Sequence, residues 1–170
     1  MNTLVIGLGN PILGDDGAGW RVVEKVQQQI DAASSEARAG AVGGVDFDYC
    51  TLGGLSLMER LIGYDQAILV DAVVTGGQPG AVTCIRLDDL PDYSTAHTTA
   101  VHDTSLQNAL RVGRVMGAHL PETVWVVGIE AKSVYTFSEE LTPVVAAAIP
   151  PAARSVLNLI RQISLEEVSP

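Results

Sequence analysis

A strand, a glycine-rich loop and a helix are predicted in succession within the first 30 residues, and this order constrains the fold more than any other feature. Residues 3–6 are apolar or β-branched, glycines recur through residues 7–19, and apolar residues at helical spacing predict a helix from about Gly17 to Ile30. A loop in this position lies at the carboxyl end of its strand, where open α/β sheets bind ligands. The loop of residues 7–19 is therefore the first candidate site.

The rest of the chain alternates strand and helix patterns in the same way. Strands are expected at residues 45–50, 66–70, 81–87 and 123–129, with Asp71 ending the second of these. Helices are expected at residues 55–62, from 103 or 104 to about 116, and from Pro143 onward with Thr142 as N-cap. Pro150 and Pro151 are expected to break or kink this last helix.

The connecting segments complete the predicted architecture. Residues 31–44 are expected to end the first helix and form a loop, and residues 88–101 to form a longer one. Because residues 81–87 follow the preceding strand closely, we expect an antiparallel edge pairing there. The chain is thus predicted to be α/β: one domain over residues 1–170, a three-layer α/β/α sandwich around a mainly parallel, twisted sheet of about five strands.

The charge and hydropathy pattern of the chain argue against several classes of partner. The formal net charge of −10 disfavours nucleic acid and anionic membrane surfaces. The chain opens without a basic segment and has no apolar run of membrane-spanning length, so a cytoplasmic protein with no membrane partner is expected. Cys50 and Cys84 lack a C-x-x-C spacing and are expected to be reduced and partly buried. The oligomeric state is left open.

Three candidate site residues come from separate segments but from equivalent places in the predicted topology. Asp16 follows the first strand, Asp71 ends the central strand, and His102 precedes a helix. Two carboxylates and one imidazole suit a borderline divalent metal and leave coordination positions open. The same three groups also suit acid/base hydrolysis.

Each candidate also has an ordinary structural interpretation. Asp15 or Asp16 is a good N-cap, and Asp71 is suited to binding loop N–H groups. His102 is as easily an ordinary loop histidine; by position alone His97 is an equal candidate, and His119 is a weaker one.

Two phosphate-binding motifs fail in the opening loop. The dinucleotide fingerprint requires Gly or Ala where Ile12 stands, and no Gly-Lys-Ser/Thr is present for a Walker A loop. Residues 7–11 resemble the Gly-Leu-Gly-Asn-Pro segment of peptidyl-tRNA hydrolases. That resemblance stops at Pro11, because the catalytic His that follows in those enzymes is absent and the acidic balance suits tRNA poorly.

A second resemblance covers nearly the whole chain in order. The chain resembles the hydrogenase maturation proteases in three marker regions: Gly7-Leu8-Gly9-Asn10 with Asp15-Asp16-Gly17-Ala18-Gly19, Ile68-Leu69-Val70-Asp71-Ala72-Val73, and His102-Asp103-Thr104-Ser105-Leu106. The resemblance extends to Gly128-Ile129-Glu130 and to Leu141-Thr142-Pro143. The first marker is fairly specific, and the others are specific in combination with it.

The resemblance implies an endopeptidase that removes the C-terminal extension from the large-subunit precursor of a NiFe-hydrogenase after nickel insertion. The two acidic metal ligands and the His ligand of that family match Asp16, Asp71 and His102, which are thus the predicted catalytic and metal-binding residues. The nickel belongs to the substrate, and no tightly bound cofactor is expected in the free protein. A non-catalytic nickel-binding accessory protein is the alternative, and a peptidyl-tRNA hydrolase-like esterase is a remote third.

Three positions depart from the family pattern. Asp16 stands where many relatives have Glu, Leu52 where several have Asp, and Ala131 where Pro is common. These departures leave the three predicted ligands intact and leave open which hydrogenase is processed. Hydrolysis by metal-polarised water and by carboxylate assistance both remain possible, and Asp15 is assigned a capping or supporting role.

Overall fold

One five-stranded sheet forms the middle layer of the protein. The computed structural model describes residues 2–36, 44–90 and 105–166. Its strands are β1 (Thr3–Leu8), β2 (Val45–Cys50), β3 (Gln66–Val73), β4 (Val82–Arg86) and β5 (Thr123–Glu130), in the order β2-β1-β3-β5-β4. Neighbours are parallel except β4 and β5. The predicted mainly parallel sheet with one antiparallel edge is confirmed, although the edge strand pairs with β5 and not with β3.

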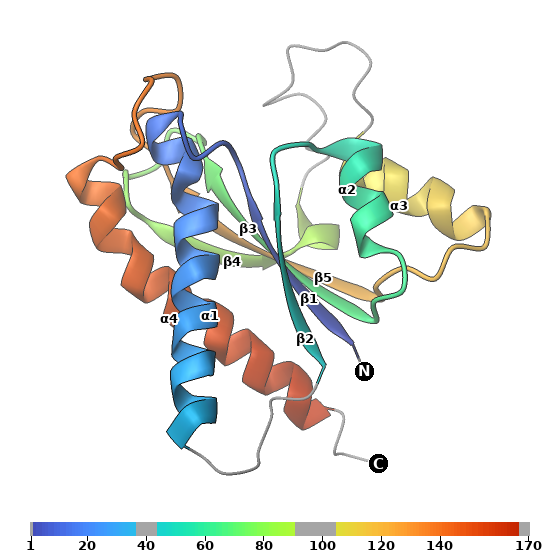
Figure 1. The fold of residues 1–170 in the computed structure, drawn as a ribbon. Helices are drawn as coiled ribbons and strands as arrows, with labels where there is room; N and C mark the ends of the chain where they lie inside the picture. Colours follow the sequence, from blue (N-terminus) through green and yellow to red (C-terminus); the bar gives the residue numbers. More distant parts are fainter. Residues whose placement is uncertain (1, 37–43, 91–104, 167–170) are drawn as a thin grey trace.

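Helices cover both faces of the sheet, which confirms the three layers (Figure 1). On one face lie α1 (Ala18–Glu36) and α4 (Pro143–Glu166), and on the other lie α2 (Gly54–Leu61) and α3 (Leu106–Val115). Short 3-10 turns precede α1, as η1 (Gly14–Gly17), and follow β4, as η2 (Leu87–Asp89).

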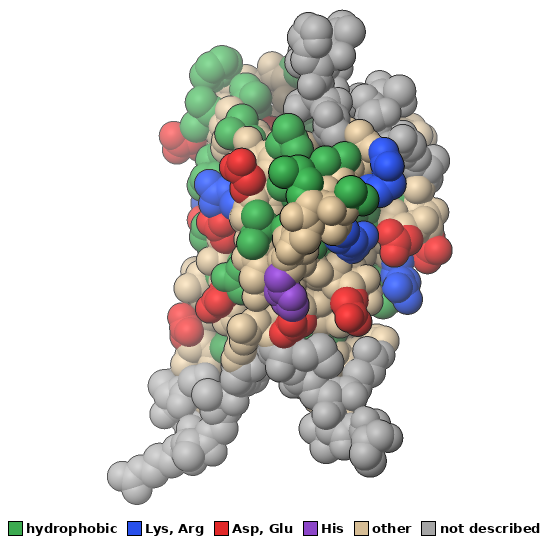
Figure 2. All heavy atoms as spheres, turned by 90° about the vertical axis from the view of Figure 1, so that its right-hand side faces the viewer, with side chains coloured by type: hydrophobic (Ala, Val, Ile, Leu, Met, Phe, Trp, Pro, Cys, Tyr) green, Lys and Arg blue, Asp and Glu red, His purple; other side chains and the backbone are tan. Residues whose placement is uncertain are grey.

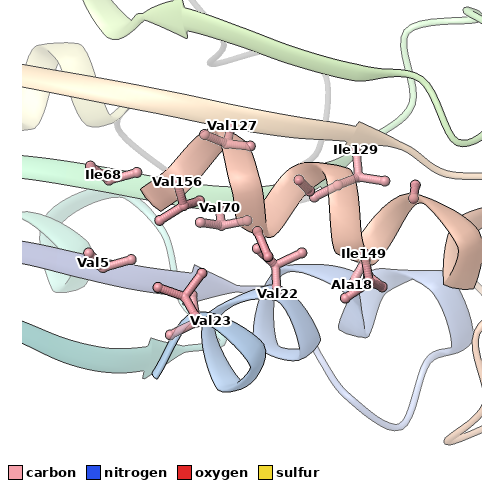
Figure 3. Packing of buried hydrophobic residues seen from close by; sticks show 14 of the residues in the cluster. Val5, Ala18, Val22, Val23, Ile68, Val70, Val127, Ile129, Ile149 and Val156 are labelled. Atoms are coloured by element: carbon pink, nitrogen blue, oxygen red, sulfur yellow. The ribbon is translucent and has the colours of Figure 1, made fainter. Parts of the chain in front are cut away.

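Alternate residues of the strands feed two separate cores. Val5, Ile68 and Val127 pack against α1 and α4, and Figure 3 shows this cluster with Val22 of α1 and Val156 of α4. The intervening strand residues pack with α2 and α3 in a second core made of Leu4, Ile6, Leu57, Leu61, Ala67, Leu69, Leu110 and Val124 together with several flanking residues. A strand residue thus faces α1 and α4 or α2 and α3 according to its position in the pleat.

The surface over α2 and α3 carries apolar side chains among charged ones (Figure 2). Exposed apolar residues of this surface include Leu55, Ile62, Val112, Val115 and Met116.

The C-terminal helix α4 is notably apolar: its residues Pro143–Leu165 have the length and hydropathy of a membrane span. Since one side of α4 supplies buried residues to the core, these properties suit a core helix of this fold.

Several element ends differ from the sequence-based expectations. α1 continues to Glu36 instead of ending near Ile30, and residues 37–43 lie outside the described chain. β3 continues past Asp71 to Val73, because its pairing with β5 extends from Asp71 opposite Gly128 to Val73 opposite Glu130. The expected loop of residues 88–101 begins with η2, and its residues 91–101 lie outside the described chain.

The α3 helix begins later than expected. Its N-cap is Ser105, whose Oγ accepts a hydrogen bond from the Asn108 N–H at 3.2 Å. The helix therefore starts at Leu106 and not at residue 103 or 104, and it ends at Val115, one residue before the expected end. Serine is one of the preferred N-cap residues, but the sequence pattern alone did not identify Ser105 as the residue that begins this helix.

Of the break or kink expected at Pro150 and Pro151, the break is wrong, because α4 is one helix from Pro143 to Glu166, and the kink stays a prediction. Ala148, Ile149 and Ala152, which flank the prolines, are all buried. Burial of this apolar face offsets the two helical hydrogen bonds that the prolines cannot donate.

The expectation that the cysteines are reduced holds for both, whereas the expectation of burial holds for only one of them. Both are free thiols, but Cys50 is buried whereas Cys84 is exposed. Cys84 lies on β4, an edge strand. Its side chain lies on the opposite face of the sheet from those of its neighbours Thr83 and Ile85.

A glycine allows α1 to approach the ends of two strands. A Cβ at Gly19 would collide with the carbonyl oxygens of Leu8 and Val70. Gly19→Ala is therefore expected to lower the free energy of unfolding by at least about 2 kcal/mol, measured by urea denaturation. Gly53→Ala is the matched control, since nothing lies within 4 Å of its Cβ position and only a loss below about 1 kcal/mol is expected. Equal losses in the two variants would contradict this interpretation.

Candidate functional site

Asp15 joins the opening loop to the segment between β5 and α4. It is 0% exposed. Its Oδ2 accepts hydrogen bonds from the N–H groups of Lys132 and Ser133, both at 3.0 Å, and from the Thr142 hydroxyl at 2.9 Å. Its Oδ1 accepts from the Thr142 N–H at 2.7 Å. The supporting role expected for Asp15 is confirmed. Thr142 directly precedes α4, the position expected of its N-cap, and donates its hydroxyl to this carboxylate.

Asp16 is held in place by the glycine loop. Its Oδ2 accepts a hydrogen bond from the Asn10 N–H at 2.7 Å, and the residue is partly exposed. Gly9 has a φ of +106° and packs directly on the Asp16 backbone, where any Cβ would collide with the Asp16 carbonyl oxygen. The loop therefore needs glycine at this position both for its conformation and for space.

Asp71 lies near Asp16 although 55 residues separate them in the sequence. Its side chain lines a cavity on the α2 and α3 face of β3. Burial raises the pKa of Asp71 to about 7, the neighbouring Asp16 carboxylate acts in the same direction, and the Ala72 N–H opposes them. The structure thus brings two of the three predicted site residues together, at the carboxyl end of the central strands.

The histidine candidates divide between the described and undescribed parts of the chain. His102, the third predicted ligand, and His97 both lie outside the described residues. His119 contacts Asp65 at 2.9 Å, in loops that precede β5 and β3 and so at the opposite end of the sheet. Within residues 2–36, 44–90 and 105–166, no three His, Cys, Asp or Glu side chains are grouped to hold a metal ion.

Glu130, the last residue of β5, is a site residue that the sequence interpretation did not single out. Its Oε1 accepts hydrogen bonds from the N–H groups of Thr75, Gly76 and Gly77 at 2.9–3.1 Å, and its Oε2 accepts from the Thr75 hydroxyl at 2.7 Å. Burial opposes ionisation, but these donors outweigh it and lower the pKa of Glu130. Glu130 therefore fixes the turn between β3 and β4 as a carboxylate.

A cavity of about 260 Å³ lies beside two of these side chains, Asp71 and Glu130. It lies against β3, β4 and β5, with Asp71 and Glu130 in its wall, and most of its other lining is apolar. The only sequence signal for this arrangement was the Gly-Ile-Glu end of β5, because the cavity depends on pairing among three strands.

Two of the departures from the family pattern lie close to this region. The Ala131 N–H donates to the Val73 carbonyl at 2.8 Å, a hydrogen bond that proline in the same position has no N–H to make. Leu52 is 60% exposed, and its carbonyl accepts a hydrogen bond from the Cys50 thiol at 3.1 Å.

The raised pKa of Asp71 predicts a specific effect on stability. The folded protein keeps this proton up to about pH 7, whereas the unfolded chain loses it near pH 3.8, so stability falls as pH rises between these values. Asp71→Asn is therefore expected to raise Tm by about 5 °C at pH 8, with the gain shrinking toward pH 4. Thermal denaturation of the free protein at several pH values measures this. Asp31→Asn, on the exposed surface of α1, is the control, and a pH-independent difference for Asp71→Asn would contradict the prediction.

Comparison with known proteins gives consistent matches. The family model described as hydrogenase maturation protease matches residues 50–159. A hydrogenase expression/formation protein, HupD, from Rhizobium leguminosarum bv. viciae is 27% identical over 158 residues, covering 93% of this chain and 73% of that protein. The hydrogenase 2 maturation protease of Escherichia coli (strain K12) is 29% identical over 170 residues, covering 99% and 96% of the two chains.

Solved structures give the same picture. The hydrogenase maturating endopeptidase HybD from E. coli matches with a TM-score of 0.76 and 29% identity, over 95% of this chain and 93% of that one. The NiFe hydrogenase maturation protease HycI from Thermococcus kodakarensis KOD1 matches with a TM-score of 0.63 and 17% identity, over 94% and 92%. At that identity the second likeness concerns the fold alone.

Proposed function

This chain belongs to the hydrogenase maturation protease family and is a peptidase, and we propose that it removes the C-terminal extension from the large-subunit precursor of a NiFe-hydrogenase. The observation that carries the proposal is the meeting of Asp16 and Asp71 beside a cavity, within a chain whose family model covers residues 50–159. The partner is a hydrogenase precursor. The cytoplasmic location expected from the sequence stays a prediction.

Nickel in the precursor is proposed as the recognition element. Asp16 and Asp71 repel one another when both are ionised, and a cation shared between them relieves this repulsion. With the imidazole of His102 as the predicted third ligand, these carboxylates would provide an incomplete ligand set, which suits a metal whose remaining ligands come from the substrate. Cleavage would then depend on whether nickel has been inserted.

Asp71 is also suited to the proton transfer that peptide hydrolysis requires. The pKa of about 7 belongs to the metal-free site, and a cation bound beside Asp71 favours the carboxylate, which is the form that accepts a proton from water. In the proposed reaction Asp71 takes a proton from water as the water oxygen bonds to the scissile carbonyl carbon. The amide C–N bond then breaks, and the proton passes to the departing amine. Polarisation of the carbonyl by the substrate's nickel is the alternative source of activation.

The proposed activity is tested with purified protein and a nickel-loaded precursor. Mass spectrometry is expected to detect a shortened large subunit and a released C-terminal peptide whose masses add up to that of the precursor plus one water. A complex that forms without any cleavage would overturn the peptidase proposal and favour the accessory nickel-binding alternative.

A further inference from the structure

The cavity beside Asp71 has the properties of a specificity pocket. Resting on the proposed function, we propose that this cavity binds the apolar side chain of the precursor residue next to the scissile bond. The enzyme would thereby select precursors with a large aliphatic or aromatic residue at that position.

The chemistry of the cavity wall favours an apolar occupant. Besides a few polar and glycine positions, the wall consists of apolar side chains such as Leu57, Leu69, Val73, Ile85, Leu106 and Val126. The oxygens of Glu130 already accept four hydrogen bonds from the β3–β4 turn. No Lys, Arg or His is among the described residues that line the cavity. Among these described lining residues an acidic side chain would therefore meet two carboxyl groups and no Lys, Arg or His.

The size of the cavity fits one large side chain. An apolar cavity of about 150 Å³ is known to bind benzene, and this one measures about 260 Å³. Leu, Met or Phe therefore fits with space left for adjoining backbone. Asp71 is part of the same wall. A substrate side chain bound in the cavity would therefore hold the adjacent peptide bond near the proposed catalytic carboxylate.

Gly128 lies in the wall of the cavity and allows close packing there. It is buried on β5 directly opposite Asp71 in the β3–β5 register. It is not among the positive-φ glycines, so the backbone does not require glycine here. A Cβ would stand 2.9 Å from Thr83 Oγ1 and 3.3 Å from Val73 Cγ2, inside the cavity lining. Glycine at this position therefore allows Thr83 and Val73, two residues of the cavity wall, to pack closely over β5.

The first part of the test changes only the substrate. Once mass spectrometry has located the cleaved bond, each flanking residue of the precursor is replaced in turn by Leu, Phe, Ala, Asp and Lys. At one flanking position, kcat/KM is expected to fall at least about 10-fold from Leu or Phe to Asp or Lys. Equal rates for all replacements at both flanking positions would overturn the proposal. A preference for Lys over Leu and Phe at the position that discriminates would also overturn it.

The second part changes the pocket and uses a matched control. Thr83 lines the cavity, whereas Cys84 is the next residue on β4, is exposed and does not line it. Thr83→Phe is expected to slow cleavage of the Leu precursor at least about 10-fold while largely sparing the Ala precursor, since the added ring fills the pocket. Cys84→Phe should leave this discrimination unchanged. Equal effects of the two variants on both precursors would overturn the proposal.

Failure of the proposed function and failure of the pocket assignment give different results. If the wild-type protein cleaves no nickel-loaded precursor, the proposed function is wrong and this inference falls with it. If the wild-type protein cleaves every flanking-residue variant at the same rate, the proposed function stands and only the pocket assignment is wrong. Thermal denaturation of both β4 variants establishes that altered rates come from folded protein.

Discussion

Asp71→Asn is expected to lower the rate of precursor processing at least about 100-fold while leaving the protein folded. The amide keeps the shape of the side chain but neither accepts a proton from water nor supplies an anionic ligand. The rate is measured from the appearance of the shortened large subunit under single-turnover conditions with nickel-loaded precursor.

The exposed variant Asp31→Asn is the matched control, because it also removes one carboxylate but lies on the outer surface of α1. It should process at the wild-type rate. Because Asp71→Asn relieves electrostatic repulsion, its Tm should not fall, and a reduced rate therefore cannot be attributed to unfolding. An Asp71→Asn protein that retains most of the activity would exclude Asp71 from the chemical step and from metal recognition.

Asp15→Ala is expected to destabilise the protein by about 3–5 kcal/mol, the largest effect on stability that we expect from a single substitution. The change removes a fully buried carboxylate that accepts four hydrogen bonds, and it leaves the N–H groups of Lys132, Ser133 and Thr142 without this acceptor. Unfolding in urea, monitored by circular dichroism, measures the loss.

The neighbouring aspartate is the natural control for this variant. Asp16→Ala removes the hydrogen bond to Asn10 but also relieves the repulsion of Asp71, so a change below about 1 kcal/mol is expected. Adjacent residues are thus assigned opposite roles, Asp15 in holding the loops together and Asp16 in the site. Similar stability losses in the two variants would contradict this division.

The sequence was sufficient to predict the layers and most strands, because their signals are local. Residues 67–70 are continuously apolar, as is typical of a strand covered on both faces, and β3 does lie at the centre of the sheet. Its continuation past Asp71 was not predictable, since it depends on the length of the partner strand β5. The uninterrupted α4 was missed for a similar reason: burial against the sheet outweighs the local effect of Pro150 and Pro151.

The site was predictable where topology alone brings residues together. Asp16 follows β1 and Asp71 lies near the carboxyl end of the neighbouring parallel strand β3, and the structure places them within electrostatic reach of one another. The role of Glu130 was not predictable, because its partners in the β3–β4 turn are 53–55 residues away and their N–H groups carry no side-chain signal. The third ligand, His102, lies outside the described residues and stays a prediction.

We propose that the Asp16 and Asp71 carboxylates recognise nickel in the precursor. It is tested most directly by measuring the cleavage rate of the same precursor with and without nickel, using wild-type protein and Asp16→Asn. We predict that wild-type protein cleaves the nickel-loaded precursor at least about 100-fold faster than the nickel-free one, and that Asp16→Asn loses most of this difference. Equal cleavage of the two precursors by wild-type protein, or full nickel dependence in Asp16→Asn, would contradict the account.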